Sequence, residues 1–539
     1  MHLSTALTAF ALVSAVAAEH GAGAGPRRRH HGKGPRKRCA AHSALESSSP
    51  SSIAASVVAV QSAADVASAA AAVASAAITA SLAVNNAYAY QGGGVSHSVL
   101  RLQALAVAVS SAAPAASSAS STGTTTTNAS TSSSGKQVFA HFMIGIVEPY
   151  TQADHEADQS LAKSKGITGF ALNIGTDDYT VTQLTNAYAA AQAVGFNVFI
   201  SFDFNWYSTS DVSAVASIVS QFVGQPAQFL VDGMPFVSSF IGDGFDWSSV
   251  ASSVGKQLYV VPYFQPDLAT QSGLEGLFSW DAWPGQGNNV PILANMTTDQ
   301  DYVYIDAVDA ASKTYMAPVS AWFMTHFPAS TYNKNWAFYS EELWKIRWDQ
   351  ILSMGSDLNY IEIITWNDFG ESHYIGPYDT PHTDDGSSAW ASGLDHTAML
   401  DMAVPYINAF KAAQTTVTVQ DEMLVYWYRP HLKSAECDST DMCGAKPTGW
   451  DFLEDSVFVT AMTISGGTVT VTSGSNAAVT TTVDAGVQIF QVPMGVGTQS
   501  FSFQTNSGGS GSGSGNVSIS ADCWNGNYNF NFHSGSITV

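Results

Sequence analysis

The sequence predicts an α/β fold in which a (β/α)8 TIM barrel, residues 136–414, is followed by a small C-terminal β-sandwich, residues 415–539, and preceded by a low-complexity N-terminal region. Apolar runs alternate with segments that carry apolar residues at helical spacing, and eight such runs fall within roughly 280 residues. An open doubly wound sheet is the alternative. No Gly-rich phosphate loop follows the first run, which counts against that alternative.

The N-terminal region is expected to carry no chemistry. Residues 1–18 form an apolar stretch that ends in small residues, which is typical of a cleaved signal peptide. Residues 19–38 hold seven Lys and Arg and end in a dibasic site, so they are interpreted as a basic propeptide or, equally, as a solvated basic tail. Residues 39–135 are rich in Ala, Ser and Thr and are interpreted as a low-complexity region and linker.

Each of the eight apolar runs is interpreted as one barrel strand. The runs comprise residues 138–145, 167–175, 196–204, 235–243, 257–264, 276–283, 314–323 and 359–368. Residues 181–195, VTQLTNAYAAAQAVG, are one of the intervening segments with helical periodicity. The set closes with residues 396–413, which predict a last helix.

After residue 414 the pattern changes to short Val/Thr-rich runs separated by Gly and Ser, which predicts an antiparallel sandwich. Residues 507–515, SGGSGSGSG, are expected to form a long flexible loop between strands. The sandwich would either hold a glycan or cover the barrel.

Composition limits the class of partner. The chain has 20 Lys and Arg against 43 Asp and Glu, a formal net charge of -23, which disfavours nucleic acid and anionic membranes as partners. No run after the signal peptide is suited to span a membrane. We expect a secreted monomer, with sequons at Asn128, Asn295 and Asn516 compatible with glycosylation.

Four cysteines fit an oxidising compartment. Cys437 and Cys443 close a short loop and are the favoured pair, while Cys39 and Cys523 lie far apart in the sequence, and the four cysteines allow three pairings. No CxxC or His spacing accompanies them, so we expect no metal site and no cofactor.

Polar residues close most of the predicted strands. In a (β/α)8 barrel the C-terminal ends of the strands form one rim, so these side chains should meet there. The carboxylates, amide and imidazole concerned are those of His141, Asn173, Asp203, Asp243, Asp281, Asp368 and Glu371. Nearby tryptophans are Trp206, Trp280, Trp283, Trp322 and Trp366.

A rim of acids and indole rings suits a carbohydrate substrate. Sugar C–H groups stack on indole faces, and sugar hydroxyls need Asp and Asn as acceptors. Cleavage of a glycosidic bond then needs one carboxylic acid and one carboxylate. Each residue also has a structural interpretation, since strand-terminal Asp often caps a helix and His141 lies between two phenylalanines. Asp177-Asp178 and Asp384-Asp385 are interpreted as solvated turns rather than a cation site.

Ordered sequence blocks carry a family resemblance. KQVFAHFMIGIVEPYT, GITGFALNIGTDDYT, GFNVFISFDF, GLFSWDAWP, YMAPVSAWFMTHFP and IEIITWNDFGESHYIGP resemble the fungal α-1,3-glucanases, the mutanases of glycoside hydrolase family 71. The resemblance implies a hydrolase that cleaves α-1,3-glucan of fungal walls or mutan, with inversion at the anomeric carbon, in the extracellular space or cell wall. The alternative is a non-catalytic wall-glucan-binding protein on the same scaffold.

The resemblance also implies roles for particular residues. Glu371 would be the general acid and Asp368 the general base, with carboxyl groups about 6.5–9.5 Å apart if the enzyme inverts. A separation of about 5 Å would instead favour a retaining mechanism. The expected substrate contacts are Asp203, Asp243, Asp281, Asn173, His141, Trp206, Trp283, Trp366, His373 and Tyr374. Ile241 and Asp267 depart from the family pattern, and these departures concern subsite contacts rather than the reaction class.

Overall fold

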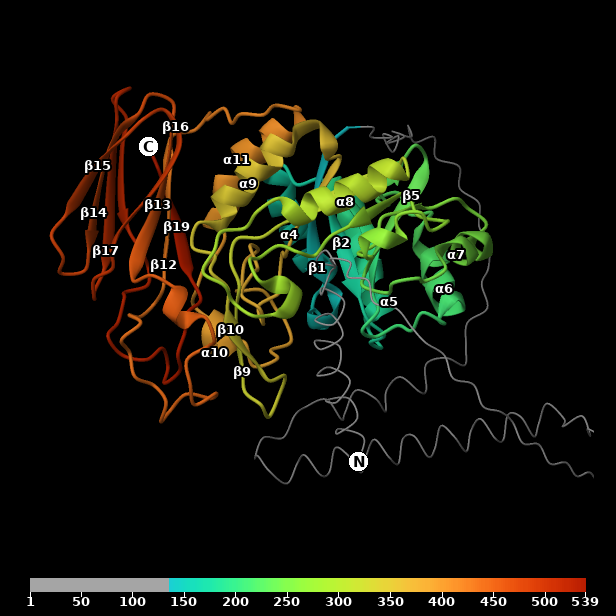
Figure 1. The fold of residues 1–539 in the computed structure, drawn as a ribbon, viewed down its shortest axis with the longest axis horizontal. Coiled ribbons are helices and arrows are strands. Elements are labelled where there is room, and N and C mark those ends of the chain that lie inside the picture. The colour runs from blue at the N-terminus through green and yellow to red at the C-terminus, as the bar shows by residue number, and fades with distance from the viewer. Residues whose placement is uncertain (1–134) are drawn as a thin grey trace, which may run out of the picture. The chain divides into compact units, whose positions relative to one another are not determined.

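A computed structural model describes residues 135–539 (Figure 1). The expected signal peptide, the basic propeptide and all of the expected linker except its last residue lie outside the described residues. Between residues 135 and 539, the helices are all too short or too polar to cross a membrane.

A curled sheet of eight parallel strands forms the centre of the first part of the chain, which confirms the expected mixed α/β class. Each strand lies within or overlaps one of the eight predicted runs. The strands are β1 (Gln137–Met143), β2 (Gly169–Ile174), β3 (Asn197–Asp203), β5 (Met234–Phe240), β6 (Tyr259–Val260), β7 (Gly276–Phe278), β8 (Thr314–Val319) and β11 (Tyr360–Ile363).

Strand pairing follows the chain around this sheet. β1, β2, β3, β5 and β6 pair in sequence, as do β7, β8 and β11, and β11 returns to pair with β1. Between β6 and β7 a single parallel bridge joins Tyr263 and Phe278. Two additions were not predicted: β4 (Leu230–Val231), which pairs antiparallel with β5, and a hairpin of β9 (Met324–Phe327) and β10 (Lys334–Ala337).

Helices flank the strands (Figure 1). They are α4 (Gln152–Ser164), α5 (Thr180–Val194), α6 (Val212–Phe222), α7 (Trp247–Val254), α8 (Asp299–Ala310), α9 (Leu343–Met354), the short α10 (Ser388–Ala391) and α11 (Ala398–Lys411). Local signals fix several ends: Thr151 and Asp154 form a capping box at the start of α4, and Gly195 ends α5 in the left-handed conformation.

Alternating side chains of the strands build two layers of core. On β1, Val138, Ala140 and Phe142 pack in the cluster that contains the helices, while Phe139 points to the other face and contacts Phe199 at a ring separation of 4.9 Å. His141 lies two residues further along the same inner face. The aromatic layer around Phe139 therefore forms the floor beneath the polar groups at the C-terminal ends of the strands.

Asp158 is a buried carboxyl group on α4, and it makes stability depend on pH. It accepts a hydrogen bond from Tyr150 Oη at 2.9 Å, and burial raises its pKa to about 7. Because an unfolded Asp titrates near pH 4, this group should cost the native state up to about 4 kcal/mol as pH rises from about 4 to above 7. Asp158→Asn is expected to remove that part of the loss, as measured by urea unfolding at pH 4 and pH 8. Parallel stability curves for the two proteins would contradict the prediction.

Two four-stranded antiparallel sheets follow. One has the order β16 (Gly486–Pro493), β13 (Ser456–Thr463), β12 (Met423–Tyr428), β19 (His533–Thr538). The other has the order β15 (Val479–Val483), β14 (Gly467–Ser473), β17 (Gln499–Thr505), β18 (Ser510–Ser514). Residues of both, such as Leu424 and Val471, belong to one apolar cluster.

The Ser/Gly segment near residue 510 is not a flexible loop, contrary to expectation. Residues 510–514 form β18 and pair antiparallel with β17. A Cβ on Gly511 would lie 2.4 Å from the carbonyl oxygen of Thr538, so glycine permits a close approach that a larger residue would prevent.

The expected disulfide is also wrong. Cys437 pairs with Cys523, with Cα atoms 5.8 Å apart, and Cys443 is a free thiol. The backbone between Cys437 and Cys443 forms a turn in which the amide of Asp441 donates to the carbonyl of Cys437 at 2.9 Å. Proximity in sequence was therefore a poor guide, because the partner comes from a segment 86 residues away.

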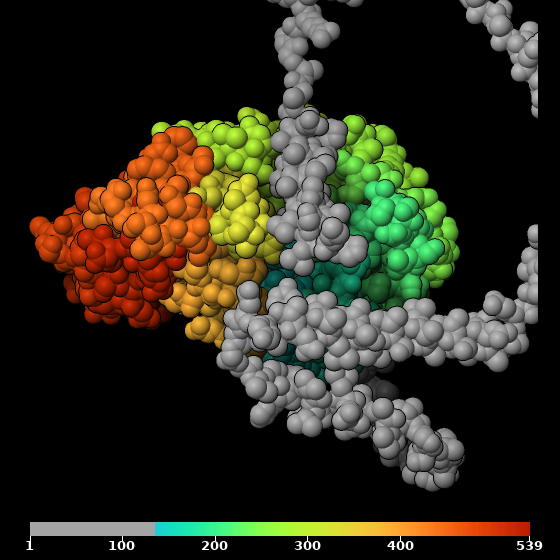
Figure 2. Space-filling view, turned by 90° about the horizontal axis from the view of Figure 1, so that it is seen from below, coloured from blue at the N-terminus to red at the C-terminus, as the bar shows by residue number. Residues whose placement is uncertain are grey.

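The C-terminal sheets lie directly against the parallel-sheet part of the same compact unit. Figure 2 shows the orange and red C-terminal segments next to the yellow ones. Buried contacts join them, among them the Arg429 guanidinium, 3.2 Å from Glu341 Oε1. Residues after 415 thus share buried polar contacts with the loops at the ends of the parallel strands.

Candidate active site

The acidic loop after β11 is held in shape by its own hydrogen bonds. Thr365 Oγ1 accepts from the amide of Asp368 at 2.8 Å, and Asp368 Oδ1 accepts from the amide of Glu371 at 2.9 Å. The amide of Trp366 donates to the carbonyl of His141 on β1 at 2.7 Å, which attaches the loop to the first strand. The side chains of Asp368 and Glu371 remain 17% and 20% exposed, so solvent reaches both.

His373 and Lys334 bind the two carboxylates. His373 Nε2 lies 3.5 Å from Asp368 Oδ2 and 3.2 Å from Glu371 Oε2, while its Nδ1 lies 3.1 Å from Thr365 Oγ1. Lys334 Nζ, from the β9–β10 hairpin, lies 2.6 Å from Glu371 Oε1. The loop and the hairpin together therefore enclose a pair of acids between two nitrogen groups.

The two carboxyl groups have opposite electrostatic environments. Burial raises the pKa of Asp368, and the nearby charge of Glu371 raises it further, against the lowering effect of His373. Burial alone would raise the pKa of Glu371 too, but the Lys334 ammonium and the hydrogen bond from His373 lower it to about 2. Burial lowers the pKa of Lys334, but the charges of Glu371 and Asp368 outweigh it, so the net shift is upward.

A second set of polar side chains lies on β1, β3 and β11. Asp203, at the end of β3, accepts from the amide of Asn205 at 2.9 Å, and burial raises its pKa to about 6. The charges of His141 and Lys334 oppose that rise, so Asp203 is within electrostatic reach of the Lys334–Glu371 pair. His141 Nδ1 lies 2.7 Å from Glu362 Oε1 on β11, and both side chains are buried.

The remaining predicted polar residues lie elsewhere on the rim. Asp243 Oδ1 accepts from the amide of Gln265 at 3.1 Å. Burial raises the pKa of Asp281 to about 6, and its charge and that of Asp243 both act on Tyr263, so these acids share the β5–β7 side of the ring. Asn173 is buried on β2, opposite Met143 of β1.

The predicted aromatic contacts divide into exposed and buried ones. Trp206 is 57% exposed, and its indole covers Gly175, where a Cβ would lie 3.1 Å from the ring. Trp283 is buried with its ring centre 4.9 Å from that of His373. Trp366 packs against Phe170 in the core, and the Tyr374 hydroxyl donates to the carbonyl of Leu394 at 2.8 Å, so both support the acidic loop from beneath.

Sequence reasoning missed Glu362 and Lys334. Glu362 had a signal, since it interrupts the apolar run YIEII at a position where a strand buries both faces. Lys334 had none, because it belongs to a hairpin inserted after β8 whose folding back onto Glu371 depends on contacts far apart in sequence.

Two groups in the described part of the chain have metal-ligand spacing. Asp368, Glu371 and His373 form one, and His326, Asp441 and Cys443 the other, each with ligand atoms within 4.8 Å of one another. In both groups the carboxylates already accept hydrogen bonds from protein donors. The arrangement of the first group suits proton transfer, since it holds one carboxyl with a raised pKa beside one with a lowered pKa.

Comparison with known proteins gives consistent matches. The model of the family described as Glycosyl hydrolase family 71 matches residues 134–539. A mutanase from Penicillium rubens is 46% identical over 373 residues, which cover 68% of this chain and 82% of that protein. The glucan endo-1,3-alpha-glucosidase agn1 of Schizosaccharomyces pombe is 37% identical, with 67% and 86% covered, and the ascus wall endo-1,3-alpha-glucanase of that yeast is 32% identical, with 66% and 84% covered.

Proposed function

Because the chain belongs to glycosyl hydrolase family 71, we propose that it hydrolyses the α-1,3 linkages of glucan at the loop that carries Asp368 and Glu371. The observation that carries the proposed site is the contrast between these neighbouring groups, one favoured in its neutral form by burial and the other held ionised by Lys334. The test is the release of reducing ends from insoluble α-1,3-glucan by the purified protein. An insoluble β-1,3-glucan serves as the control and should release none.

Asp368 is proposed as the proton donor to the leaving oxygen and Glu371 as the ionised carboxylate. This reverses the roles expected from the sequence. A general acid must keep its proton at the working pH, which a raised pKa permits, while a group with a pKa of about 2 stays ionised even in acidic media. The proximity of Lys334 to Glu371 is the physical cause of the difference.

Inversion is proposed for the stereochemical course, with Glu371 activating the attacking water. Oxygens of Asp368 and Glu371 lie within 4.8 Å of each other, whereas inverting enzymes hold their carboxyl groups about 6.5–9.5 Å apart. The proposal therefore requires that a bound glucose unit separate the two side chains. NMR of the first product decides, since inversion gives a β anomer. An initial α anomer would instead mean that Glu371 attacks the anomeric carbon directly.

We propose that exposed and partly exposed residues at the C-terminal ends of the parallel strands contact the substrate. Trp206, which is 57% exposed, would stack against a sugar ring, and Asp203, within electrostatic reach of Lys334, would accept hydrogen bonds from sugar hydroxyls. Asp243 and Asp281 would serve more distant glucose units, on the β5–β7 side. His141, Asn173, Trp283 and His373 would support these groups, together with Trp366 and Tyr374.

For the whole chain, we propose a closed (β/α)8 barrel of residues 136–414 and a β-sandwich of residues 415–539. The return of strand pairing to β1 supports the first, and the apolar cluster shared by two antiparallel sheets supports the second. Secretion of a monomer to the cell wall or medium is also proposed. N-terminal sequencing and gel filtration of protein from the medium test this.

Lys334→Met is expected to move the acid limb of the kcat/KM profile to higher pH. Without the ammonium, only His373 still opposes the effect of burial on Glu371, so its pKa should rise from about 2 toward its ordinary value of about 4.3. The limb should therefore move upward by up to about two pH units, measured with soluble α-1,3-glucan oligomers. Lys345→Met, which removes a lysine paired with Asp349 on α9, is the control and should leave the limb in place.

A further inference from the structure

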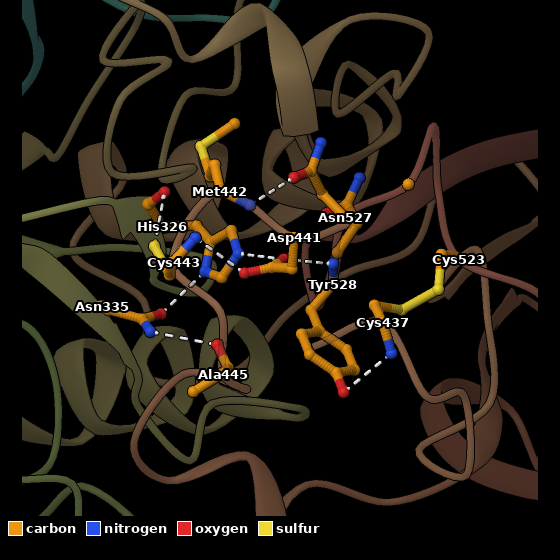
Figure 3. Close-up of polar contacts among 12 residues, drawn as sticks. His326, Asn335, Cys437, Asp441, Met442, Cys443, Ala445, Cys523, Asn527 and Tyr528 are labelled. Atoms are coloured by element: carbon orange, nitrogen blue, oxygen red, sulfur yellow. Dashed lines mark hydrogen bonds and ion pairs between the residues drawn. A yellow bond between two sulfur atoms is a disulfide. The ribbon is translucent and has the colours of Figure 1, made fainter. Parts of the chain in front are cut away.

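A second buried polar cluster lies where the C-terminal region contacts the β9–β10 hairpin (Figure 3). His326 Nε2 lies 2.7 Å from Asp441 Oδ2, and both side chains are fully buried. His326 Nδ1 lies 2.7 Å from Asn335 Oδ1, and the Asn335 amide nitrogen donates to the carbonyl of Ala445 at 3.2 Å, which fixes the orientation of that amide. Since both partners of the ring are acceptors, both ring nitrogens carry protons.

Asp441 is itself fixed by the C-terminal backbone. Its Oδ2 accepts from the amide of Tyr528 at 2.7 Å, and its Oδ1 accepts from the amide of Cys443 at 2.8 Å. The disulfide between Cys437 and Cys523 ties together the two segments that provide these donors. Asp441 is therefore a rigid anchor for the imidazolium rather than a mobile surface acid.

The side chains of this cluster suit a protonated histidine better than a bound metal ion. Both nitrogens of His326 and both oxygens of Asp441 have protein partners, and Cys443 Sγ donates to the carbonyl of His326 at 3.4 Å. A metal ion would have to displace two protons and break hydrogen bonds of 2.7 Å on each side of the ring. The cluster is thus complete as a charged hydrogen-bond network.

The network reaches the active site through the hairpin. Asn335 pairs with His326 in the β9–β10 register, and Lys334 is its chain neighbour. The C-terminal segment supports the hairpin from the other edge, since the amide of Ala337 donates to Thr448 at 2.9 Å and the amide of Thr448 donates to Asn335 at 3.0 Å. At the start of the hairpin the amide of Met324 donates to the carbonyl of Glu371 at 3.2 Å.

We propose that His326 and Asp441 are positioning residues, which through Asn335 hold the β9–β10 hairpin so that Lys334 Nζ meets Glu371. The loop of residues 437–448, although it belongs to the C-terminal region, then helps to set the geometry of the active site. The expected effect of His326 and Asp441 on catalysis rests on the proposed function, because these residues act through Glu371. The structural coupling between His326 and Lys334 does not depend on the proposed function.

A double-mutant cycle tests the link. His326→Gln is expected to lower kcat by roughly tenfold, the scale of one hydrogen bond to a charged group, with KM little changed. In the Lys334→Met background the same substitution should have no further effect, because the ammonium it positions is gone. Asn335→Ala, which leaves the His326–Asp441 pair intact, should behave in the same way. His155→Gln, at a buried histidine of α4 whose Nε2 lies 3.1 Å from Gln183 Oε1 on α5, is the control and should act equally in both backgrounds.

Unfolding midpoints of the same variants give a readout independent of activity. The shifts for His326→Gln and Lys334→Met should sum to more than the shift of the double variant. Equal effects of His326→Gln on kcat and on the midpoint in both backgrounds would overturn the proposal. If wild type cleaves no α-1,3-glucan, the proposed function fails, and the midpoints alone still decide the link. A Zn²⁺-dependent rise in the wild-type midpoint that His326→Gln abolishes would show a cation site instead and would also overturn it.

Discussion

Asp368→Asn and Glu371→Gln are each expected to lower kcat on α-1,3-glucan by about 10²–10⁴-fold, the usual contribution of a positioned acid or base. Both substitutions keep the shape of the side chain and one oxygen that accepts hydrogen bonds. They remove the proton that Asp368 would donate and the negative charge that Lys334 and His373 hold on Glu371. The measurement is reducing-end release at saturating substrate.

The choice of leaving group separates the two roles. An α-1,3-glucooligosaccharide fluoride needs little help from a proton donor, because fluoride leaves without strong acid catalysis. Asp368→Asn should therefore retain most of its activity on the fluoride, while Glu371→Gln should lose activity on both substrates, since water activation is needed in each case. The opposite result would restore the roles expected from the sequence.

Binding of insoluble glucan provides the control for these variants. Both should bind as wild type does, because neither substitution removes the exposed Trp206 or the carboxylate of Asp203. Asp349→Asn, on the surface of α9, should retain full activity. If wild type itself released no reducing ends while all variants bound equally, the chain would be a glucan-binding protein without catalysis.

The parallel strands were predictable because each is a short apolar run whose pattern depends on local burial. Phe139 and Phe199 show this directly, since both lie in runs that could be found without knowledge of the fold. The acids at the strand ends followed from the rule that carboxyl ends of such strands share one rim. Asp368 and Asp203 are the clearest cases.

What the sequence could not predict depends on contacts between distant segments. Lys334 and Asp441 meet Glu371 and His326 only after the hairpin and the C-terminal loop have folded onto the ring, and nothing in their local sequence marks them. The proposed exchange of the acid and base roles could not follow from spacing for the same reason, since the lysine that lowers the pKa of Glu371 is 37 residues away. The Cys437–Cys523 disulfide is a third example.

Asp301→Asn is expected to cost about 3–5 kcal/mol of unfolding free energy, the usual effect of removing one partner from a buried ion pair. Arg347, on α9, is fully buried, and its Nη1 and Nη2 each lie 2.6 Å from an oxygen of Asp301 on α8. Its Nε donates to the carbonyl of Pro318 on β8 at 2.8 Å. The pair thus connects two helices to one strand, and the variant would leave the guanidinium without its hydrogen-bonded carboxylate. Urea unfolding near neutral pH measures the loss.

Replacing both partners distinguishes loss of attraction from an uncompensated charge. Asp301→Leu with Arg347→Met should cost less than either single substitution, because apolar side chains of similar size fill the site and no ion is left alone in it. On the same helix, the exposed Lys345–Asp349 pair offers the matched comparison, and Asp349→Asn should change the unfolding free energy very little. If Asp301→Asn proved as mild as Asp349→Asn, water would have to reach the guanidinium, and the buried pair could not be what fixes α8 and α9 against β8.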